Sequence, residues 1–229
     1  MIPLRDHNPT RTVPFVTVAL IAANLAVFLY QLNVMAQGEQ VFLRFVYQMA
    51  MFPAKVSHDF GADAVRSIFT SMFLHGGLLH IGGNMLYLWV FGNNIEDSMG
   101  HFRFLVFYTL CGYVAAFGHV LAAPDSQVPT MGASGAIAGV LGAYLLLFPR
   151  ARIDTWVPVW WLFLTTIEVP AYFFLVFWFI LQLLNGLPAL AFDAVERGGG
   201  VAWWAHIGGF VAGLALVAIF KRRDARLFQ

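Results

Sequence analysis

Charged residues are scarce in this chain. They make up 11% of its 229 residues, whereas 60% are hydrophobic. Soluble domains carry about a quarter charged residues, and a water-soluble protein of this length has too little interior to hide so much apolar surface. The composition therefore indicates a polytopic membrane protein, and the length leaves room for one compact domain over residues 1–229.

Two other scarcities exclude classes of function. A single cysteine, Cys111, rules out an internal disulfide and a cysteine-rich metal site. A net charge of +1, without a basic stripe outside the C-terminal tail, argues against a nucleic-acid partner. The sequence also lacks the HExxH pattern of zinc hydrolases. We therefore expect no metal and no cofactor.

Apolar runs of membrane-crossing length recur along the chain. We predict an all-α membrane protein of six transmembrane helices, with spans at about 14–34, 78–95, 102–122, 134–148, 169–191 and 202–220. The first run is expected to direct insertion and to remain as a span. Lysine and arginine are more frequent on the side that holds both termini, which predicts cytoplasmic termini.

Two connecting stretches are rich in aromatic residues. The stretch 35–67 contains four Phe residues, one Tyr and few charges, and the stretch 156–167 contains three tryptophans. Aromatic side chains favour the boundary between lipid and water. We therefore expect both stretches to lie in the membrane interface.

The run 134–148 is too short to cross the bilayer. Its 15 residues make a helix of about 22 Å, whereas the hydrocarbon core is about 30 Å thick. Arg150 fixes one end at the surface, so the end at Ser134 should lie below the opposite surface. Irregular backbone at that depth must be buried or line a wet cavity. The sequence thus predicts a water-filled cavity with Ser134 at its floor, open to the outside.

Four polar residues fall at a similar predicted depth. His80 and Asn84 share one face of the second predicted helix, Ser134 begins the fourth, and His206 lies about one and a half turns into the sixth. Polar groups within a membrane are costly, so each requires a reason. Their shared depth indicates that they form one site.

These residue types suit serine hydrolysis. Ser134 supplies a nucleophile, and His206 a base that titrates near neutral pH. The Ser134 N–H at a helix N-terminus, with His80 and Asn84, provides donors for an oxyanion. Gly132 allows a substrate backbone to approach. No carboxylate falls at that depth, so the sequence predicts a Ser–His dyad.

Each feature also has a structural interpretation. A run such as Gly-Ala-Ser-Gly commonly forms a packing surface between membrane helices. A single His or Asn often hydrogen-bonds across helices, and the α/β-hydrolase elbow would require glycine where Ala136 stands. Gly209 and Gly213 have GxxxG spacing, and we expect them to pack closely against a neighbouring helix.

Four motifs occur together and in order. They are HGGLLHIGGN at 75–84, GASG at 132–135, AHIGGFVAG at 205–213, and Arg66 ahead of the second span. Together they resemble the rhomboid family of intramembrane serine proteases, and the resemblance covers about residues 14–220. A single one of these motifs is weakly specific, whereas the ordered set is strongly specific.

The resemblance implies a role for each site residue. Ser134 would attack the scissile carbonyl to form an acyl-enzyme, and His206 would accept and return the proton. His80, Asn84 and the Ser134 backbone would stabilise the oxyanion. Substrates would be single-pass membrane proteins within the lipid bilayer, with the stretch 169–191 as a lateral gate. The basic six-helix form implies a bacterial plasma membrane.

Two positions depart from the family pattern. Val65 precedes Arg66 where a tryptophan is usual, which affects how the first loop sits in the bilayer. Ala138 stands where some members place a tyrosine under the catalytic histidine. Another group must therefore orient His206.

Two other functions remain open at this point. One is a pseudoprotease or chaperone-like binder on the same scaffold, although such proteins typically lose the Ser or the His that this chain keeps. The other is a transporter or channel, which would spread ionisable residues through the midplane or show an inverted repeat. Labelling of the serine would separate these classes.

Overall fold

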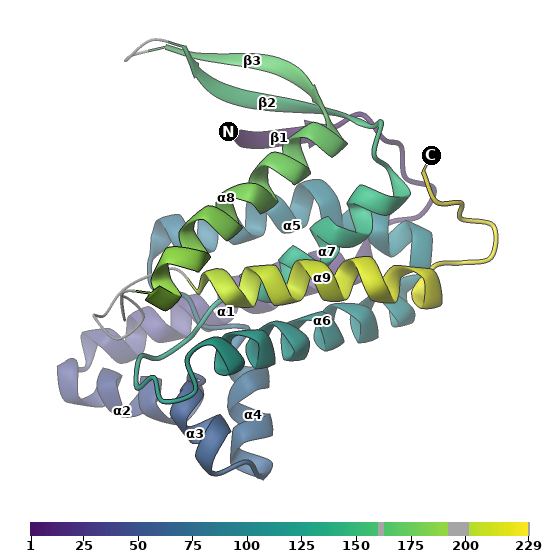
Figure 1. The fold of residues 1–229 in the computed structure, drawn as a ribbon. Coiled ribbons are helices and arrows are strands. Elements are labelled where there is room, and N and C mark those ends of the chain that lie inside the picture. The colour runs from purple at the N-terminus through teal and green to yellow at the C-terminus, as the bar shows by residue number, and fades with distance from the viewer. Residues whose placement is uncertain (160–162, 192–201, 229) are drawn as a thin grey trace.

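The computed structural model describes residues 1–159, 163–191 and 202–228, which form a helical bundle with a small sheet at one side (Figure 1). The helices are α1 (Phe15–Ala36), α2 (Glu39–Met49), α3 (Pro53–His58), α4 (Ala62–Ser71), α5 (Leu78–Met99), α6 (His101–Ala122), α7 (Ser134–Leu147), α8 (Ala171–Ala191) and α9 (Trp203–Phe220). The strands are β1 (Ile2–Asp6), β2 (Arg152–Val159) and β3 (Phe163–Pro170).

Six of these helices coincide with the six predicted spans. Within the described residues, α1, α6 and α9 are long and apolar enough to cross a membrane. Helix α7 and the stretch Ala171–Leu187 of α8 are apolar but shorter. The positions of the helices are therefore confirmed, whereas six membrane crossings remain a prediction.

The expectation of an all-α protein is wrong in one region. Strands β1, β2 and β3 form an antiparallel sheet in that order, and the N-terminal strand pairs with a hairpin more than 140 residues away. The hairpin includes much of the stretch assigned to the membrane interface. Its β-branched residues Ile153, Thr155, Ile167 and Val169 favour strands. The prediction for this stretch rested on its tryptophans and did not consider the β-branched residues.

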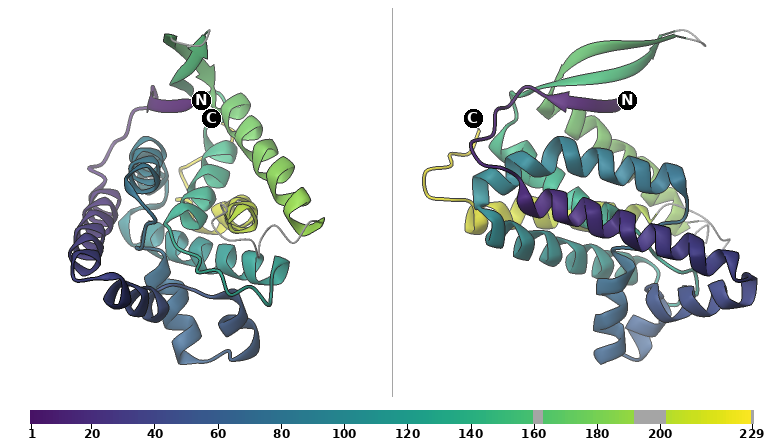
Figure 2. Two further views of the ribbon diagram at one scale, coloured as in Figure 1. Left: turned by 90° about the vertical axis from the view of Figure 1, so that its left-hand side faces the viewer. Right: turned by 180° about the vertical axis from the view of Figure 1, so that it is seen from behind.

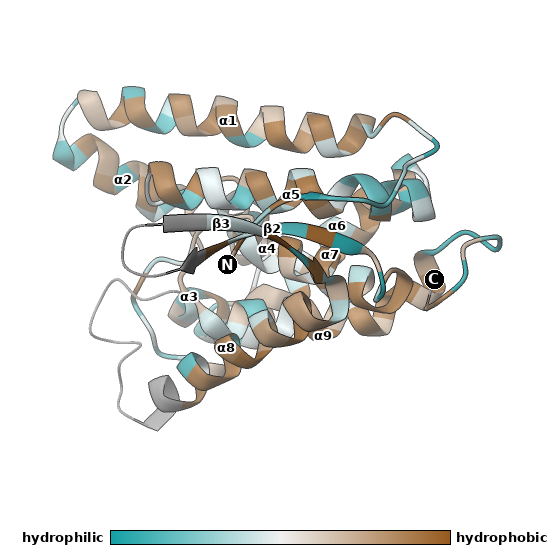
Figure 3. Ribbon diagram, turned by 90° about the horizontal axis from the view of Figure 1, so that it is seen from above, coloured by the Kyte–Doolittle hydropathy of each residue, from teal (hydrophilic) through white to brown (hydrophobic). Residues whose placement is uncertain are grey.

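Apolar side chains remain exposed over the outer faces of the bundle. Helix α8 alone exposes Tyr172, Phe173, Ile180 and Leu184, and brown stretches run along α1 and α9 in Figure 3. Contiguous apolar surface of this kind marks a membrane or protein interface. The described surface therefore suits a lipid environment.

Helix α7 lies beside α9 near the middle of the bundle (Figures 1 and 2). Most of its side chains are buried, and two of its glycines, Gly135 and Gly139, meet glycines of α9 at backbone contact. A Cβ atom built on Gly209 would lie 2.0 Å from the carbonyl oxygen of Gly135, and one built on Gly213 would lie 1.9 Å from that of Gly139. The predicted close packing of Gly209 and Gly213 is confirmed.

A buried carboxylate joins α5 to the start of α1. Glu96 is fully buried and accepts hydrogen bonds from the backbone N–H groups of Val16 (2.9 Å) and Thr17 (2.7 Å) and from the Thr17 hydroxyl (2.7 Å). First-turn N–H groups have no partner within their helix, and the helix dipole favours negative charge there. Glu96 thereby caps α1 from another helix.

The sheet is tied to the bundle through Asp6. Its carboxylate accepts hydrogen bonds from the hydroxyl of Tyr144 in α7 (2.5 Å) and from the amide of Asn94 in α5 (2.6 Å). Burial raises the pKa of Asp6 from its ordinary value of 3.8 to about 6, an effect that the Tyr144 hydrogen bond only partly offsets.

Replacing Asp6 with asparagine is expected to remove a pH-dependent part of the stability. Because the pKa is raised in the folded protein, the contribution of this group is full below about pH 4 and is lost as the pH rises through about 6. The Tm of the unmodified protein minus that of Asp6→Asn should fall between pH 4 and 6 and then level. Thermal unfolding in detergent measures it, and a difference independent of pH would contradict the assignment.

Candidate active site

The bundle brings Ser134 and His206 into hydrogen-bond contact. Ser134 is the first residue of α7, and His206 lies one turn into α9. The Nε2 atom of His206 lies 2.8 Å from Oγ of Ser134. His206 is buried, whereas Ser134 is half-buried. The helix packing through Gly135 and Gly209 sets this distance, because it holds the two N-terminal turns together.

The other ring nitrogen of His206 has a partner that sequence reasoning missed. Its Nδ1 atom lies 2.8 Å from the amide oxygen of Gln182 in α8. The ring of Trp178, one turn earlier on α8, lies 5.8 Å from the His206 ring. Helix α8 thus supplies both a hydrogen-bond acceptor and a ring contact to His206, and Gln182 is the group that orients this ring in place of the residue expected at Ala138.

His80 faces the loop that precedes Ser134. Its Nδ1 accepts a hydrogen bond from the backbone N–H of Gly76 at 3.3 Å, so the neutral ring carries its proton on Nε2. A Cβ atom on Gly132 would lie 2.8 Å from that Nε2 and 3.6 Å from Oγ of Ser134. Gly132 has φ +131°, a conformation that favours glycine. The structure therefore brings His80, Gly132 and Ser134 together.

Asn84 lies one turn beyond His80 on α5 and is buried. Among the described residues its amide nitrogen has no hydrogen-bond partner. A buried donor without a partner is costly to maintain. Its free N–H groups join the Nε2–H of His80 and the first backbone N–H of α7 as candidate donors at this end of the bundle.

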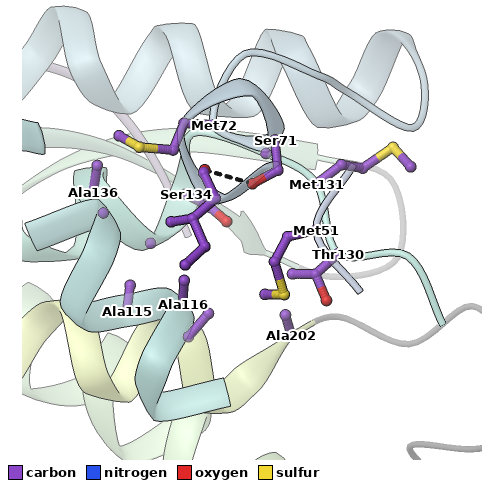
Figure 4. Close-up of a pocket in the computed structure, with 15 residues that line it drawn as sticks. Met51, Ser71, Met72, Ala115, Ala116, Thr130, Met131, Ser134, Ala136 and Ala202 are labelled. Carbon is purple, nitrogen blue, oxygen red and sulfur yellow. Dashed lines mark hydrogen bonds between the residues drawn. The ribbon is translucent and has the colours of Figure 1, made fainter. Parts of the chain in front are cut away.

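A small pocket adjoins Ser134 (Figure 4). It lies between α4, α6, the start of α7 and the loop at 130–132, and Met51, Met72 and Met131 contribute to its wall. Much of the remaining lining is Gly or Ala, from Gly112, Ala115, Ala116, Gly135, Ala136, Ala202 and Ala205. Such a lining accommodates a small apolar group next to the serine hydroxyl.

Helix α1 fixes the loop that leads into His80. The buried side chain of Gln31 donates from its amide nitrogen to the carbonyl oxygen of His75 (3.2 Å) and accepts from the His75 N–H (3.0 Å). The His75 ring lies edge-on to the His80 ring at 5.1 Å. Sequence reasoning missed Gln31 as well, although a glutamine in an apolar run was a signal that it needs a partner.

Comparison with known protein families gives a direct result. The model of the Rhomboid domain matches residues 62–223, well over half of the chain. The chain belongs to the rhomboid family. The resemblance drawn from the four motifs is thereby confirmed.

Several curated rhomboid proteins are similar to this chain. Rhomboid protein 1, mitochondrial, of Saccharomyces cerevisiae is 31% identical over 173 residues, covering 70% of this chain and 45% of the yeast protein. The human presenilin-associated rhomboid-like protein, mitochondrial, is 29% identical over 167 residues, 67% of this chain and 39% of that protein. Rhomboid protease GluP of Bacillus subtilis is 38% identical over 78 residues, 34% of this chain and 15% of GluP. The chain thus spans less than half the length of these relatives.

The expected location is contradicted by these relatives. We predicted a bacterial plasma membrane with cytoplasmic termini and an active site open to the outside, but the two longer matches above are named as mitochondrial proteins. The bacterial location was inferred from the resemblance to the basic six-helix form of the family. The number and order of helices carry no information on which membrane holds the protein, and for that reason the prediction was wrong.

Proposed function

We propose that this rhomboid protein is a serine endopeptidase that cleaves membrane proteins within or beside the bilayer. The observation that carries the proposal is the 2.8 Å contact between His206 Nε2 and Ser134 Oγ. A nucleophile within hydrogen-bond reach of a base is the geometric signature of covalent catalysis. The relative named as a rhomboid protease supports the same reaction class.

In the proposed mechanism His206 removes the proton from Ser134 as the oxygen attacks the scissile carbonyl. The carbonyl oxygen gains the negative charge, the peptide C–N bond breaks, and His206 returns its proton to the leaving amine. Water then attacks the acyl-enzyme carbonyl while His206 removes its proton. The ester bond breaks, and His206 returns the proton to Ser134. No metal or cofactor takes part in the proposal.

The oxyanion in this scheme is stabilised by three donors. They are the Nε2–H of His80, the amide of Asn84 and the backbone N–H of Ser134. The unpaired Asn84 amide supports this role, since it retains donors that no described residue uses. Donors already oriented toward the developing charge need no rearrangement during the reaction.

The substrate class follows from the surroundings of the site. The exposed apolar faces suit contact with lipid and with transmembrane segments. The relatives named as mitochondrial favour a mitochondrial membrane as that environment. The pocket beside Ser134 suits a small side chain next to the cleaved bond.

The proposal is tested by reconstituting the protein in liposomes with a single-pass membrane protein that has alanine and glycine near one membrane boundary. The unmodified protein should produce two fragments, and Ser134→Ala should produce none. Mass spectrometry of the fragments locates the cleaved bond. If folded unmodified protein leaves a panel of such substrates intact, or Ser134→Ala cleaves equally well, the proposal is wrong.

Replacing Gly132 with alanine is expected to lower kcat/KM by about 100-fold, similar to loss of an oxyanion donor. The new Cβ would lie 2.8 Å from His80 Nε2 and would push that donor away. Gly38→Ala is the matched control, because Gly38 also has a positive φ (+122°) but has nothing within 4 Å of the added carbon. Equal activity losses in the two variants would show that backbone strain, and not the His80 contact, is responsible.

A further inference from the structure

Helix α8 carries a polar residue that the proposed mechanism has not yet used. We propose that Gln182 is a positioning residue that holds His206 in the tautomer able to accept the Ser134 proton. This inference rests on the proposed function, since it assigns a task to a residue behind the proposed base. It concerns the Nδ1 side of the ring, whereas Ser134 contacts the Nε2 side.

The orientation of the Gln182 amide is set by its own helix. The amide nitrogen donates to the backbone carbonyl oxygen of Trp178 at 3.0 Å. The amide oxygen is therefore the atom that faces His206, at 2.8 Å from Nδ1. An amide oxygen can only accept a hydrogen bond, so Nδ1 must be the donor.

The tautomer of His206 follows from this arrangement. With the proton on Nδ1, the neutral ring has a lone pair on Nε2, and this lone pair faces the Ser134 hydroxyl. A reversed amide would present N–H groups to Nδ1 and move the ring proton to Nε2. A histidine with its proton on Nε2 cannot take the serine proton. The reversed amide is disfavoured because it would turn the Gln182 oxygen toward the Trp178 carbonyl oxygen.

Gln182 thus does part of the work of the aspartate in a Ser-His-Asp triad. That aspartate holds the tautomer and also stabilises the imidazolium by its charge. Gln182 is 5% exposed and uncharged, so it provides the first contribution without the cost of burying a carboxylate. In the part of the chain that the structure describes, no carboxylate is a hydrogen-bond partner of His206.

Trp178 contributes to the same arrangement in two ways. Its carbonyl orients the Gln182 amide, and its ring packs against the rings of His206 (5.8 Å) and Phe210 (6.0 Å). A third contact between the two helices, from the Trp204 indole N–H to the Gly186 carbonyl at 3.1 Å, lies one turn further along α8. Any movement that separates α8 from α9 therefore also separates the Gln182 amide oxygen from His206.

The alternative explanation is that Gln182 has only a structural role and links α8 to α9. Three variants separate the explanations. Gln182→Met keeps the length of the side chain but removes the amide acceptor, and Gln182→Glu keeps an acceptor and adds charge. Asn185→Leu is the control, because Asn185 makes the same kind of bond to the carbonyl four residues earlier (2.6 Å to Leu181) on the exposed face.

The readouts are kcat, KM and the pH dependence of kcat/KM in liposomes, with Tm as a check on folding. Gln182→Met should lower kcat by about 10- to 100-fold with KM nearly unchanged, since it removes a transition-state contribution. Gln182→Glu should retain most of the kcat of the unmodified protein. It should also move the acidic limb of the profile to higher pH by about one unit, because a nearby carboxylate favours the imidazolium. Asn185→Leu should match the unmodified protein.

The inference is overturned if Gln182→Met, in an active protein, retains kcat and the pH profile. If Gln182→Met does not fold, Gln182→Glu decides alone, and an unshifted acidic limb overturns the inference. If the unmodified protein neither cleaves substrate nor labels at Ser134, the proposed function fails and the inference with it. This outcome is distinct, because it appears before any Gln182 variant is compared.

Discussion

His206→Ala is expected to lower the rate of substrate cleavage by at least about 1000-fold, since loss of the base in serine hydrolases costs up to about 10⁶ in kcat. In the described residues, the His206 ring hydrogen-bonds the Ser134 hydroxyl at 2.8 Å. Without it the hydroxyl keeps its proton and is a weak nucleophile. Initial rates in liposomes at saturating substrate measure the effect.

The matched control for this prediction is His58→Ala. His58 is exposed and pairs with the exposed Asp125 at 2.7 Å, so its removal should leave both activity and stability nearly unchanged. The unfolding temperature of His206→Ala should also be recorded, because the His206 ring packs on Trp178. A folded His206→Ala that cleaves at even a tenth of the normal rate would exclude His206 as the base.

Gly213→Ala is expected to have the largest effect on stability. The added carbon would lie 1.9 Å from the Gly139 carbonyl oxygen, with other Gly139 backbone atoms also within 3 Å. Backbone atoms cannot turn aside as a side chain can, so α7 and α9 must separate. We expect a loss of at least about 2 kcal/mol in the free energy of unfolding, toward the upper end of overpacking costs.

Gly83→Ala is the control for Gly213→Ala. Gly83 lies within α5, and a Cβ atom there would have nothing within 4 Å. Alanine is preferred to glycine inside a helix by about 0.5–1 kcal/mol, so this variant should be as stable as the unmodified protein or more so. Denaturant or thermal unfolding in mixed micelles compares the two. Equal stability of both variants would contradict the close packing of α7 against α9.

The long helices were predictable because their signal is local. Apolar runs place α1, α5, α6, α7, α8 and α9 within a few residues of their observed bounds. The three short helices between residues 39 and 71 and the sheet were not predicted. Strand β1 depends on pairing with residues 152–156, and pairing over such a separation leaves little trace in either strand alone.

The residues of the candidate site that lie in the sequence motifs were predictable, whereas Gln182 was not. Ser134 and His206 meet because both lie in the first turn of a helix at the same end of the bundle, and helix direction follows from the order of the spans. Gln182 carried a signal, being polar within an apolar run, but its contact with His206 depends on the rotation of α8 about its axis. Hydrophobic patterning does not fix that rotation when much of the helix faces lipid.

The transport and binding alternatives make different demands on these residues. A transporter would need ionisable groups along a path through the bundle, yet the buried carboxylate of Glu96 is used to cap α1. A binding protein on this scaffold would have no use for a serine activated by a histidine. The reactivity of Ser134 therefore separates catalysis from binding.

The most direct measurement is the rate at which a fluorophosphonate labels Ser134, with the adduct located by mass spectrometry of the digested protein. We expect labelling of the unmodified protein on Ser134, none on Ser134→Ala, and a rate at least about 100-fold lower in His206→Ala, because the reagent reports an activated serine. Folded protein that stays unlabelled, carries the adduct elsewhere, or reacts equally fast without His206 would contradict the proposed dyad.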